Sequence, residues 1–327
     1  MILSPLPKDL FWCRDIAAKG RSNLWLSARA LSTHKRDIFD VSYATMRLAD
    51  DWVDQGTFAK KGLSPVLVDK ILKNQFATTS KNMIESKNTI DCRSAQTKEA
   101  LDLTKAFKFL FDQVCLDRTP WFNLMHCLQN DVQKKKIKDW DDFDHYVLGV
   151  ASAPACCFLQ ILLSNKAVFS KITDELHCSA HQMAKYCYLV HILRDLKKDA
   201  EQDAQLLTLP YQFIQNFDIY DHDELARLIC TEQTDCKFNK RLQALCDGLL
   251  KRIKQSRIKA IDACRNFIEY LQPVEANILQ FLVASYIDIE KYLKFQPDLP
   301  VKPDAQRLEK RRADLYNRYF KSPIACV

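Results

Sequence analysis

The sequence predicts an all-α protein, and three observations lead to that fold class. Apolar residues recur at helical spacing along most of the chain, whereas the period-two alternation of a half-buried strand is hardly visible. Only 5 of the 327 residues are glycine, which argues against tight hairpins and glycine-rich phosphate loops. Most of the 11 prolines stand at breaks in the helical pattern, as expected where short turns separate long helices.

The periodicity places the helices in order along the chain. They are expected at residues 8–19, 22–31, 35–54, 64–76, 98–115, 120–134, 141–164, 168–201, 223–230, 237–271, 274–294 and 304–320. Two segments interrupt the pattern: 77–97 is the most polar part of the chain, and 199–212 contains a Leu-Pro pair. Neither segment is a low-complexity linker, and no internal repeat is visible. We therefore expect a single domain over residues 1–327.

Composition and charge restrict the class of protein. The chain is 47% hydrophobic and 27% charged, so it can bury a real core. Its formal charge of +7 is too small to indicate a nucleic-acid partner. Basic residues cluster at 133–140 and 307–321. Such clusters are typical of solvated helix faces, and they also suit contact with anionic lipid headgroups or a phosphorylated substrate.

The cysteines and the apolar segments bear on location. The chain has 13 cysteines and no CxxC pair, which favours reduced thiols over a disulfide framework. The N-terminus carries no apolar run typical of a signal peptide. The longest late apolar stretch, 276–287, is about half of the ~20 residues that a membrane span needs. We expect a cytoplasmic protein with peripheral contact to a membrane.

The expected helix 35–54 carries an unusual group of carboxylates. Four of its polar residues fall along one stripe: Tyr43, Arg47, Asp50 and Asp54. Asp51 borders this stripe, and apolar residues flank it. Like carboxylates one turn apart repel each other, so they need a cation, either Arg47 or a metal. The hard oxygen ligands suit Mg²⁺, although a solvated or salt-bridged helix face explains the same pattern.

A second group lies on the expected helix 168–201. His191, Asp195 and Asp199 are spaced at i, i+4 and i+8, with Arg194 and Lys198 beside them. The preceding residues are apolar, which indicates a core helix. Two core helices with an aspartate pair and an arginine each are explained together if they hold divalent ions, which in turn hold a diphosphate. The alternative is two independent charge clusters.

The two motifs resemble the signatures of the squalene/phytoene synthase family. The first reads YATMRLADDWVD at 43–54, with the family's spacing of Tyr, Arg and DDxxD. The second reads HILRDLKKD at 191–199 and is followed by LTLP at 207–210. It resembles the family's N-I-x-R-D-x-x-x-D and Leu-Pro. Weaker similarities occur at 22–31, 130–136, 145–155 and 283–293.

The resemblance implies a fold and an activity. The fold is a single-domain isoprenoid-synthase helical bundle around a central apolar cavity. The reaction is a Mg²⁺-dependent head-to-head condensation of two prenyl diphosphates, with release of diphosphate and a presqualene/squalene- or phytoene-type product. We expect farnesyl diphosphate slightly ahead of geranylgeranyl diphosphate, and a monomer or weak dimer. Some members use NADPH, but no nucleotide-binding fingerprint supports it here.

The resemblance also assigns roles to individual residues. The implied metal ligands are Asp50, Asp51, Asp54, Asp195 and Asp199. The implied catalytic residues are Asp50, Asp54, Asp195, Asp199, Tyr43 and Tyr286. The implied substrate-binding residues are Arg47, Arg194, His191, Asn23 and Lys198. Without the resemblance, Tyr286 would be read as an ordinary core tyrosine.

The sequence departs from the family pattern around the second motif. His191 stands where the family has a metal-binding asparagine, and histidine is a less typical Mg²⁺ partner, so His191 is expected to hydrogen-bond the diphosphate. Tyr188 replaces a glutamine, and Pro154 lies in a segment that carries glycines in the family. These changes leave open a divergent prenyltransferase or terpene cyclase that acts on one prenyl diphosphate. A non-catalytic homologue is a further alternative, against which the intact aspartates argue.

Overall fold

The fold was analysed in a computed structural model. The structure describes residues 6–54, 98–133, 135–163, 170–231, 236–294 and 304–320. Every regular element within these ranges is a helix, so the prediction of an all-α protein is confirmed. The expected helix at 64–76 and the polar segment 77–97 lie outside the described residues.

Contacts between residues divide the chain into two compact units. The first unit comprises Met1–Lys135 and Leu148–Leu162, and the second comprises Lys136–Val147 and Leu163–Val327. Each unit contains one of the two acidic motifs, because residues 43–54 belong to the first and residues 191–199 to the second. The single domain expected over 1–327 stays a prediction.

The first unit is arranged around one long helix. Its elements are a 3₁₀ turn Lys8–Leu10, α1 Trp12–Lys19, α2 Asn23–Ala28, α3 Thr33–Asp54, α5 Lys98–Lys108, a π-helical turn Phe109–Gln113, α6 Thr119–Val132 and α8 Ser152–Leu162. Helix α3 packs against α1, α6 and α8. Its apolar residues Phe39, Val41 and Ala44 are buried, and the indole of Trp121 on α6 donates to the Thr45 hydroxyl at 2.9 Å. The helix that carries the first motif is therefore held on several sides.

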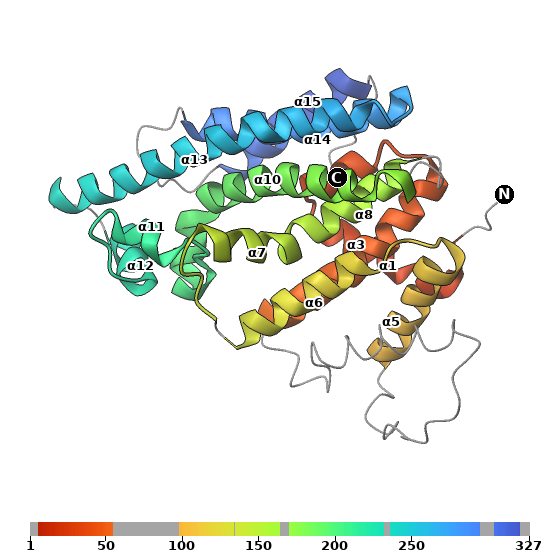
Figure 1. Cartoon of the computed structure of the whole chain (residues 1–327), viewed down its shortest axis with the longest axis horizontal. Coiled ribbons are helices and arrows are strands. Elements are labelled where there is room, and N and C mark those ends of the chain that lie inside the picture. Colours follow the sequence, from red (N-terminus) through yellow and green to blue (C-terminus); the bar gives the residue numbers. More distant parts are fainter. Residues whose placement is uncertain are drawn as a thin grey trace. The chain divides into compact units, whose positions relative to one another are not determined.

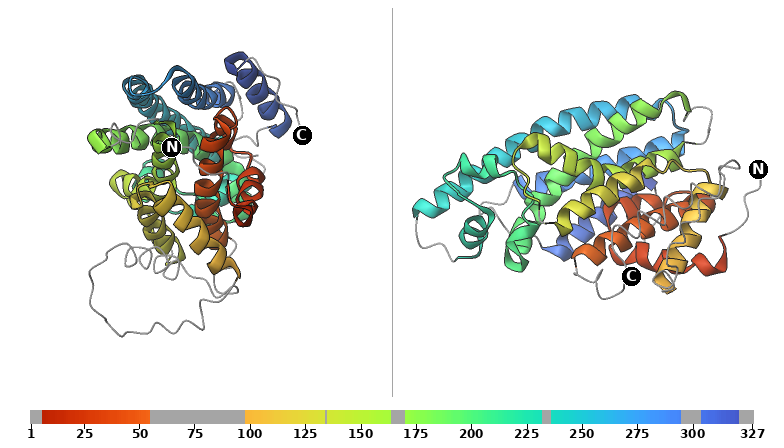
Figure 2. Two further views of the ribbon diagram at one scale, coloured as in Figure 1. Left: turned by 90° about the vertical axis from the view of Figure 1, so that its right-hand side faces the viewer. Right: turned by 60° about the horizontal axis from the view of Figure 1, so that its bottom comes forward.

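The second unit is arranged around α10. It contains the part of α7 (Trp140–Val150) that ends at Val147. Its other elements are α10 Thr173–Gln202, a 3₁₀ turn Ala204–Leu206, α11 Tyr211–Gln215, α12 His222–Cys230, α13 Cys236–Ile268, α14 Pro273–Lys294 and α15 Ala305–Phe320. Helix α10 packs against α12, α13 and α14, and α13 and α14 lie beside each other (Figures 1 and 2). In α13 the fully buried residues Leu242, Leu245, Leu249 and Ile253 recur at three- and four-residue spacing, as the apolar face of a packed helix requires.

One expected helix is two helices in the structure. The periodicity predicted a continuous helix over 141–164, but α7 ends at Val150 and α8 begins at Ser152. Pro154 explains the break, because it has no N–H for the Val150 carbonyl and its ring would crowd that oxygen. In the first turn of α8 the missing N–H costs little, since the first four N–H groups of a helix have no partner within it.

The apolar helix α8 is a core helix of the first unit. All its residues except Pro154 and Ala155 are buried. No single helix among the described residues is long and apolar enough to cross a membrane, and the broken pair α7 and α8 passes that test jointly, by length and composition. The packing of α8 on α3 and α6 accounts for its apolar composition.

A glycine allows the end of α7 to approach α6 closely. A Cβ atom on Gly149 would lie 2.2 Å from the Cys127 sulfur and 2.7 Å from the backbone oxygen of Asn123. Both distances are far shorter than ordinary van der Waals contact, and the second involves backbone that cannot rotate away. This position therefore requires glycine, because the helices approach closely here.

Candidate active site

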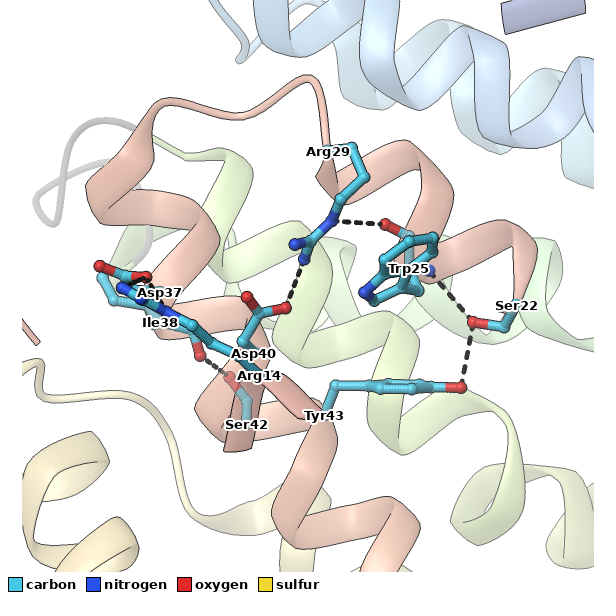
Figure 3. A network of polar contacts seen from close by, with 9 residues as sticks. All are labelled: Arg14, Ser22, Trp25, Arg29, Asp37, Ile38, Asp40, Ser42 and Tyr43. Carbon is cyan, nitrogen blue, oxygen red and sulfur yellow. Dashed lines mark hydrogen bonds and ion pairs between the residues drawn. The ribbon is translucent and has the colours of Figure 1, made fainter. Parts of the chain in front are cut away.

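Tyr43 links the first motif to the start of α2. Its ring stacks on Phe39 with centroids 5.3 Å apart, and its hydroxyl donates to the Ser22 side-chain oxygen at 3.0 Å (Figure 3). Ser22 also caps α2, because the same oxygen accepts from the backbone N–H of Trp25 at 3.1 Å. Burial raises the pKa of Tyr43 above its ordinary value, so the phenol stays neutral.

The residue that contacts Tyr43 is Ser22, the neighbour of the predicted Asn23. Asn23 is the first residue of α2 and is 3% exposed, and its substrate-binding role stays a prediction. Sequence analysis did not select Ser22. The signal that could have identified it is the serine immediately before a helical pattern, since serine is among the preferred N-cap residues.

Two ion pairs hold the first half of α3 against α1 and α2 (Figure 3). Arg14 donates to Asp37 at 2.7 Å and 3.1 Å. Arg29 lies over the Trp25 ring at 4.7 Å and donates to the buried carboxylate of Asp40. Burial raises the pKa of Asp40 although Arg29 acts in the opposite direction. These contacts fix the orientation of α3 several residues before its acidic end.

The acidic end of α3 is neutralised by its own arginine. The Arg47 guanidinium lies 2.7 Å from Asp51 and 3.7 Å from Asp50. The side chains of Arg47, Asp50 and Asp51 are 39%, 36% and 32% exposed. Burial lowers the pKa of Arg47, but the two carboxylates outweigh that effect and raise it. Asp54 ends the helix, and its side chain lies outside the described residues.

The second motif shows the same arrangement in a more buried form. Arg194 donates to both oxygens of Asp195, at 2.8 Å and 2.5 Å, and each side chain is 26% exposed. Burial raises the pKa of Asp195, but the hydrogen bonds and charge of Arg194 outweigh it, so that the pKa is lowered overall. Asp199 lies one turn further along α10 and is partly buried, whereas Lys198 is exposed.

His191 and Tyr286 meet across α10 and α14. The Tyr286 hydroxyl lies 3.0 Å from the His191 Nε2 atom, and the ring centroids are 5.2 Å apart. Tyr286 is 5% exposed. Burial, reinforced by the neighbouring charge of Arg194, lowers the pKa of His191 to about 3, so the imidazole is neutral. The structure therefore brings together two predicted site residues that are far apart in the sequence.

Tyr188 connects α10 to the loop that follows the second motif. Its hydroxyl lies 3.0 Å from the Thr208 hydroxyl, in the LTLP segment at 207–210. Its ring lies 6.0 Å from that of Phe143 and 6.1 Å from that of Tyr146. Tyr188, which replaces the family glutamine, therefore has a hydrogen-bond partner in the Thr208 hydroxyl. Sequence analysis missed Thr208, which carries no signal of its own.

The carboxylates of both motifs fit Mg²⁺ as ligands. Mg²⁺ takes hard oxygen ligands and usually binds through one or two carboxylates together with phosphate oxygens and water. Each motif offers partly exposed aspartates, Asp50 and Asp51 on α3 and Asp195 and Asp199 on α10. Among the described side chains no group of three or more His, Cys, Asp or Glu residues is placed to hold a metal by itself. Carboxylates in pairs of this kind suit a metal that also takes oxygens from phosphate and water.

Two solved structures have similar folds. A dehydrosqualene synthase in complex with ligand matches with a TM-score of 0.66 at 16% identity, covering 96% of this chain and 98% of that chain. The squalene synthase HpnC from Alicyclobacillus acidocaldarius matches with a TM-score of 0.60 at 14% identity, covering 88% of this chain and 93% of that chain. Comparison with curated protein sequences gave no match. At these identities the structures support the all-α isoprenoid-synthase fold.

The family is established by the sequence itself. The family model for squalene/phytoene synthase matches residues 17–312, which includes both acidic motifs and nearly all the described helices. The resemblance predicted from the two motifs is confirmed. The chain belongs to the squalene/phytoene synthase family, prenyltransferases that condense prenyl diphosphates head to head.

Proposed function

We propose that this chain carries out a Mg²⁺-dependent head-to-head condensation of two prenyl diphosphates, with farnesyl diphosphate preferred over geranylgeranyl diphosphate. The product is of the presqualene/squalene or phytoene type, and diphosphate is released. One observation carries the proposal: each motif holds partly exposed aspartates that are already neutralised by an arginine from the same helix, at 2.7 Å for Arg47 and Asp51 and 2.5 Å for Arg194 and Asp195.

The arginine–aspartate pairs suggest how the motifs respond to substrate. Bound Mg²⁺ would neutralise the negative charge that develops on the leaving diphosphate. The metal would be held by Asp50, Asp51, Asp54, Asp195 and Asp199. Because an ion pair as exposed as that of Arg47 and Asp51 contributes roughly 0 to 1 kcal/mol, little opposes its rearrangement. Arg47 and Arg194 then turn from carboxylate to phosphate oxygens, to which a guanidinium donates in a bidentate manner.

The tyrosines supply a dry surface for the cation. Ionisation of an allylic diphosphate leaves a carbocation that water would quench, so its surroundings must exclude water. Tyr286 is nearly fully buried, and Tyr43 is kept neutral by burial. The face of a neutral phenol ring attracts a cation. We propose both rings as walls of the substrate site.

A second candidate is a reaction on one prenyl diphosphate, either cyclisation or transfer to another acceptor. The observation that favours it is the hydrogen bond between His191 and Tyr286. The family has a metal-binding asparagine at this position, and a histidine that is engaged with a tyrosine changes the surroundings of the second diphosphate. The two candidates differ in product size.

A product assay separates the candidates. Labelled farnesyl and geranylgeranyl diphosphates are each incubated with the protein, with and without Mg²⁺ and NADPH, and the products are identified by mass. A product with twice the carbon number of the substrate supports condensation, and one with the carbon number of the substrate supports cyclisation. A squalene-type product that forms only with NADPH would show reductant use. No conversion of either substrate contradicts the proposed function.

We also propose that the protein is a cytoplasmic monomer or weak dimer with peripheral membrane contact. What supports the cytoplasmic location is that the 13 cysteines include no CxxC pair, which favours reduced thiols. The basic cluster at 307–321 falls largely on α15, where Arg307 and Lys310 are exposed. Co-sedimentation with anionic and neutral vesicles tests the membrane contact, and light scattering tests the oligomeric state. Equal binding to both kinds of vesicle contradicts a role for the basic cluster.

A further inference from the structure

We infer that His191 is a positioning residue that orients the phenol of Tyr286. The hydrogen bond from the Tyr286 hydroxyl occupies the Nε2 atom of His191, so this nitrogen is not available to bind a metal. The contact joins α10 and α14 at 3.0 Å, one helical turn before Asp195. Its effect on catalysis rests on the proposed function, whereas the contact itself does not.

The direction of the hydrogen bond follows from the two groups. A neutral imidazole has one N–H and one bare nitrogen, and the bare nitrogen is a stronger acceptor than a phenol oxygen. His191 is neutral because burial lowers its pKa. The favoured arrangement is therefore Tyr286 O–H donating to Nε2, with the ring proton of His191 on Nδ1. A metal would need the same Nε2 lone pair, so the two roles exclude each other at this atom.

A second polar contact holds the same two helices together. Tyr186 on α10 donates to Glu290 on α14 at 2.8 Å. Arg257 on α13 donates to the other Glu290 oxygen at 2.9 Å. Glu290 is 5% exposed, and Tyr186 is fully buried. A buried carboxylate that is satisfied from two helices fixes its own helix, because any shift would leave the charge unpaired.

This second contact sets the position of Tyr286. Glu290 follows Tyr286 by one helical turn on α14, and Tyr186 precedes His191 on α10. Once Glu290 is anchored, the register of α14 against α10 places the Tyr286 hydroxyl opposite His191. The hydrogen bond then restricts the remaining rotation of the phenol. A phenol that donates its proton has a more electron-rich ring, which strengthens its attraction for a cation.

Nitrogen NMR tests the contact without substrate. The full-length protein is labelled with ¹⁵N-histidine, which gives signals from its 7 histidines, and His191 is assigned by its loss in His191→Gln. We expect a bare Nε2 and a protonated Nδ1. In Tyr286→Phe the His191 signal shifts, whereas the signals of the other histidines stay in place. A protonated Nε2, or an unchanged His191 signal in Tyr286→Phe, overturns the inference.

Kinetics test whether His191 acts through Tyr286. We expect His191→Ala and Tyr286→Phe each to lower kcat roughly tenfold to hundredfold, the range for partners that orient functional groups. The double variant should be no slower than the slower single variant, because both remove one interaction. The Mg²⁺ concentration for half-maximal rate should stay unchanged in His191→Ala but rise in the control Asp195→Asn.

The opposite result has a distinct pattern. If His191 is a metal ligand, His191→Ala raises the Mg²⁺ requirement, His191→Asn restores it, and the effect adds to that of Tyr286→Phe. That pattern overturns the inference while the proposed function stands. If the wild-type protein turns over neither substrate, the proposed function fails, and the NMR measurement alone decides whether His191 holds Tyr286.

Discussion

The two acidic motifs use the same residues but are built differently. On α3, Arg47 reaches Asp51 and Asp50 from one side, and the three side chains are about one-third exposed. On α10, Arg194 donates one hydrogen bond to each oxygen of Asp195, and both side chains are only 26% exposed. Each motif also has a neighbour from another element, since Tyr43 meets Ser22 and His191 meets Tyr286. The comparison suggests an adaptable first motif and a preorganised second motif.

The difference lies in the supporting contacts. Behind the first motif, Tyr43 is tied to the capping residue Ser22. Behind the second, a buried carboxylate, Glu290, joins α14 to α10 and α13. Breaking a cap costs about 1 kcal/mol, whereas breaking a buried ion pair costs roughly 3 to 5 kcal/mol. We therefore expect variants behind the second motif to affect stability more.

The largest effect should come from the aspartates themselves. Asp50→Ala and Asp195→Ala should each lower the rate of diphosphate release by roughly a thousandfold, as expected when a group that stabilises developing charge is removed. The control is Asp262→Ala, an aspartate on α13 that is 60% exposed and outside both motifs. Unchanged turnover in either variant would show that the motif concerned takes no part in the reaction. The two motifs could then not be compared as two halves of one active site.

The next largest effect concerns Glu290. Glu290→Ala leaves Arg257 and Tyr186 without their shared partner, so we expect a loss of roughly 3 to 5 kcal/mol of unfolding free energy. Denaturant titration measures it. The matched control is Glu269→Ala on the same unit, whose side chain is exposed and should change stability by less than about 0.5 kcal/mol. Equal losses in the two variants would show that Glu290 does not anchor α14.

Gly149 tests packing in the first unit. Gly149→Ala would place its Cβ 2.2 Å from the Cys127 sulfur and 2.7 Å from the Asn123 oxygen, and overpacking of this kind costs roughly 1 to 3 kcal/mol. The comparison variant is Gly248→Ala in the second unit, where the nearest atom is the tip of the Phe217 ring at 2.7 Å. The far end of a side chain can move aside through a small change in χ1, whereas a backbone oxygen cannot, so the loss should be smaller. Thermal unfolding of both variants ranks them, and the reverse order contradicts the expectation.

The smallest effect on stability should come from Ser22. Ser22→Ala removes the cap of α2 and the acceptor for Tyr43, at a cost of about 1 kcal/mol. Ser22→Asp retains a capping oxygen and should recover most of the stability in the same denaturant titration. If the alanine variant also raises the substrate KM and the aspartate variant restores it, the contact to Tyr43 supports binding. An unchanged KM in both variants would limit Ser22 to a structural role.

Much of the local structure was predictable from the sequence. Helical periodicity and scarce glycine indicated an all-α protein, and the predicted spans around the two motifs, 35–54 and 168–201, match Thr33–Asp54 and most of Thr173–Gln202. The break between α7 and α8 was missed because periodicity continues across it. Pro154 lies well inside the expected helix 141–164, where a proline ends or kinks a helix, so the sequence contained the signal for the break.

The sequence by itself determined the chemistry of the motifs and the family. Aspartates and an arginine on one helix face are local features, because helical spacing alone decides which side chains share a face. Tertiary structure decided which residues from different helices meet. His191 with Tyr286, Ser22 with Tyr43, and Glu290 with Tyr186 and Arg257 are all contacts between separate helices. Such contacts depend on how helices pack and in what register, which periodicity within one helix does not contain.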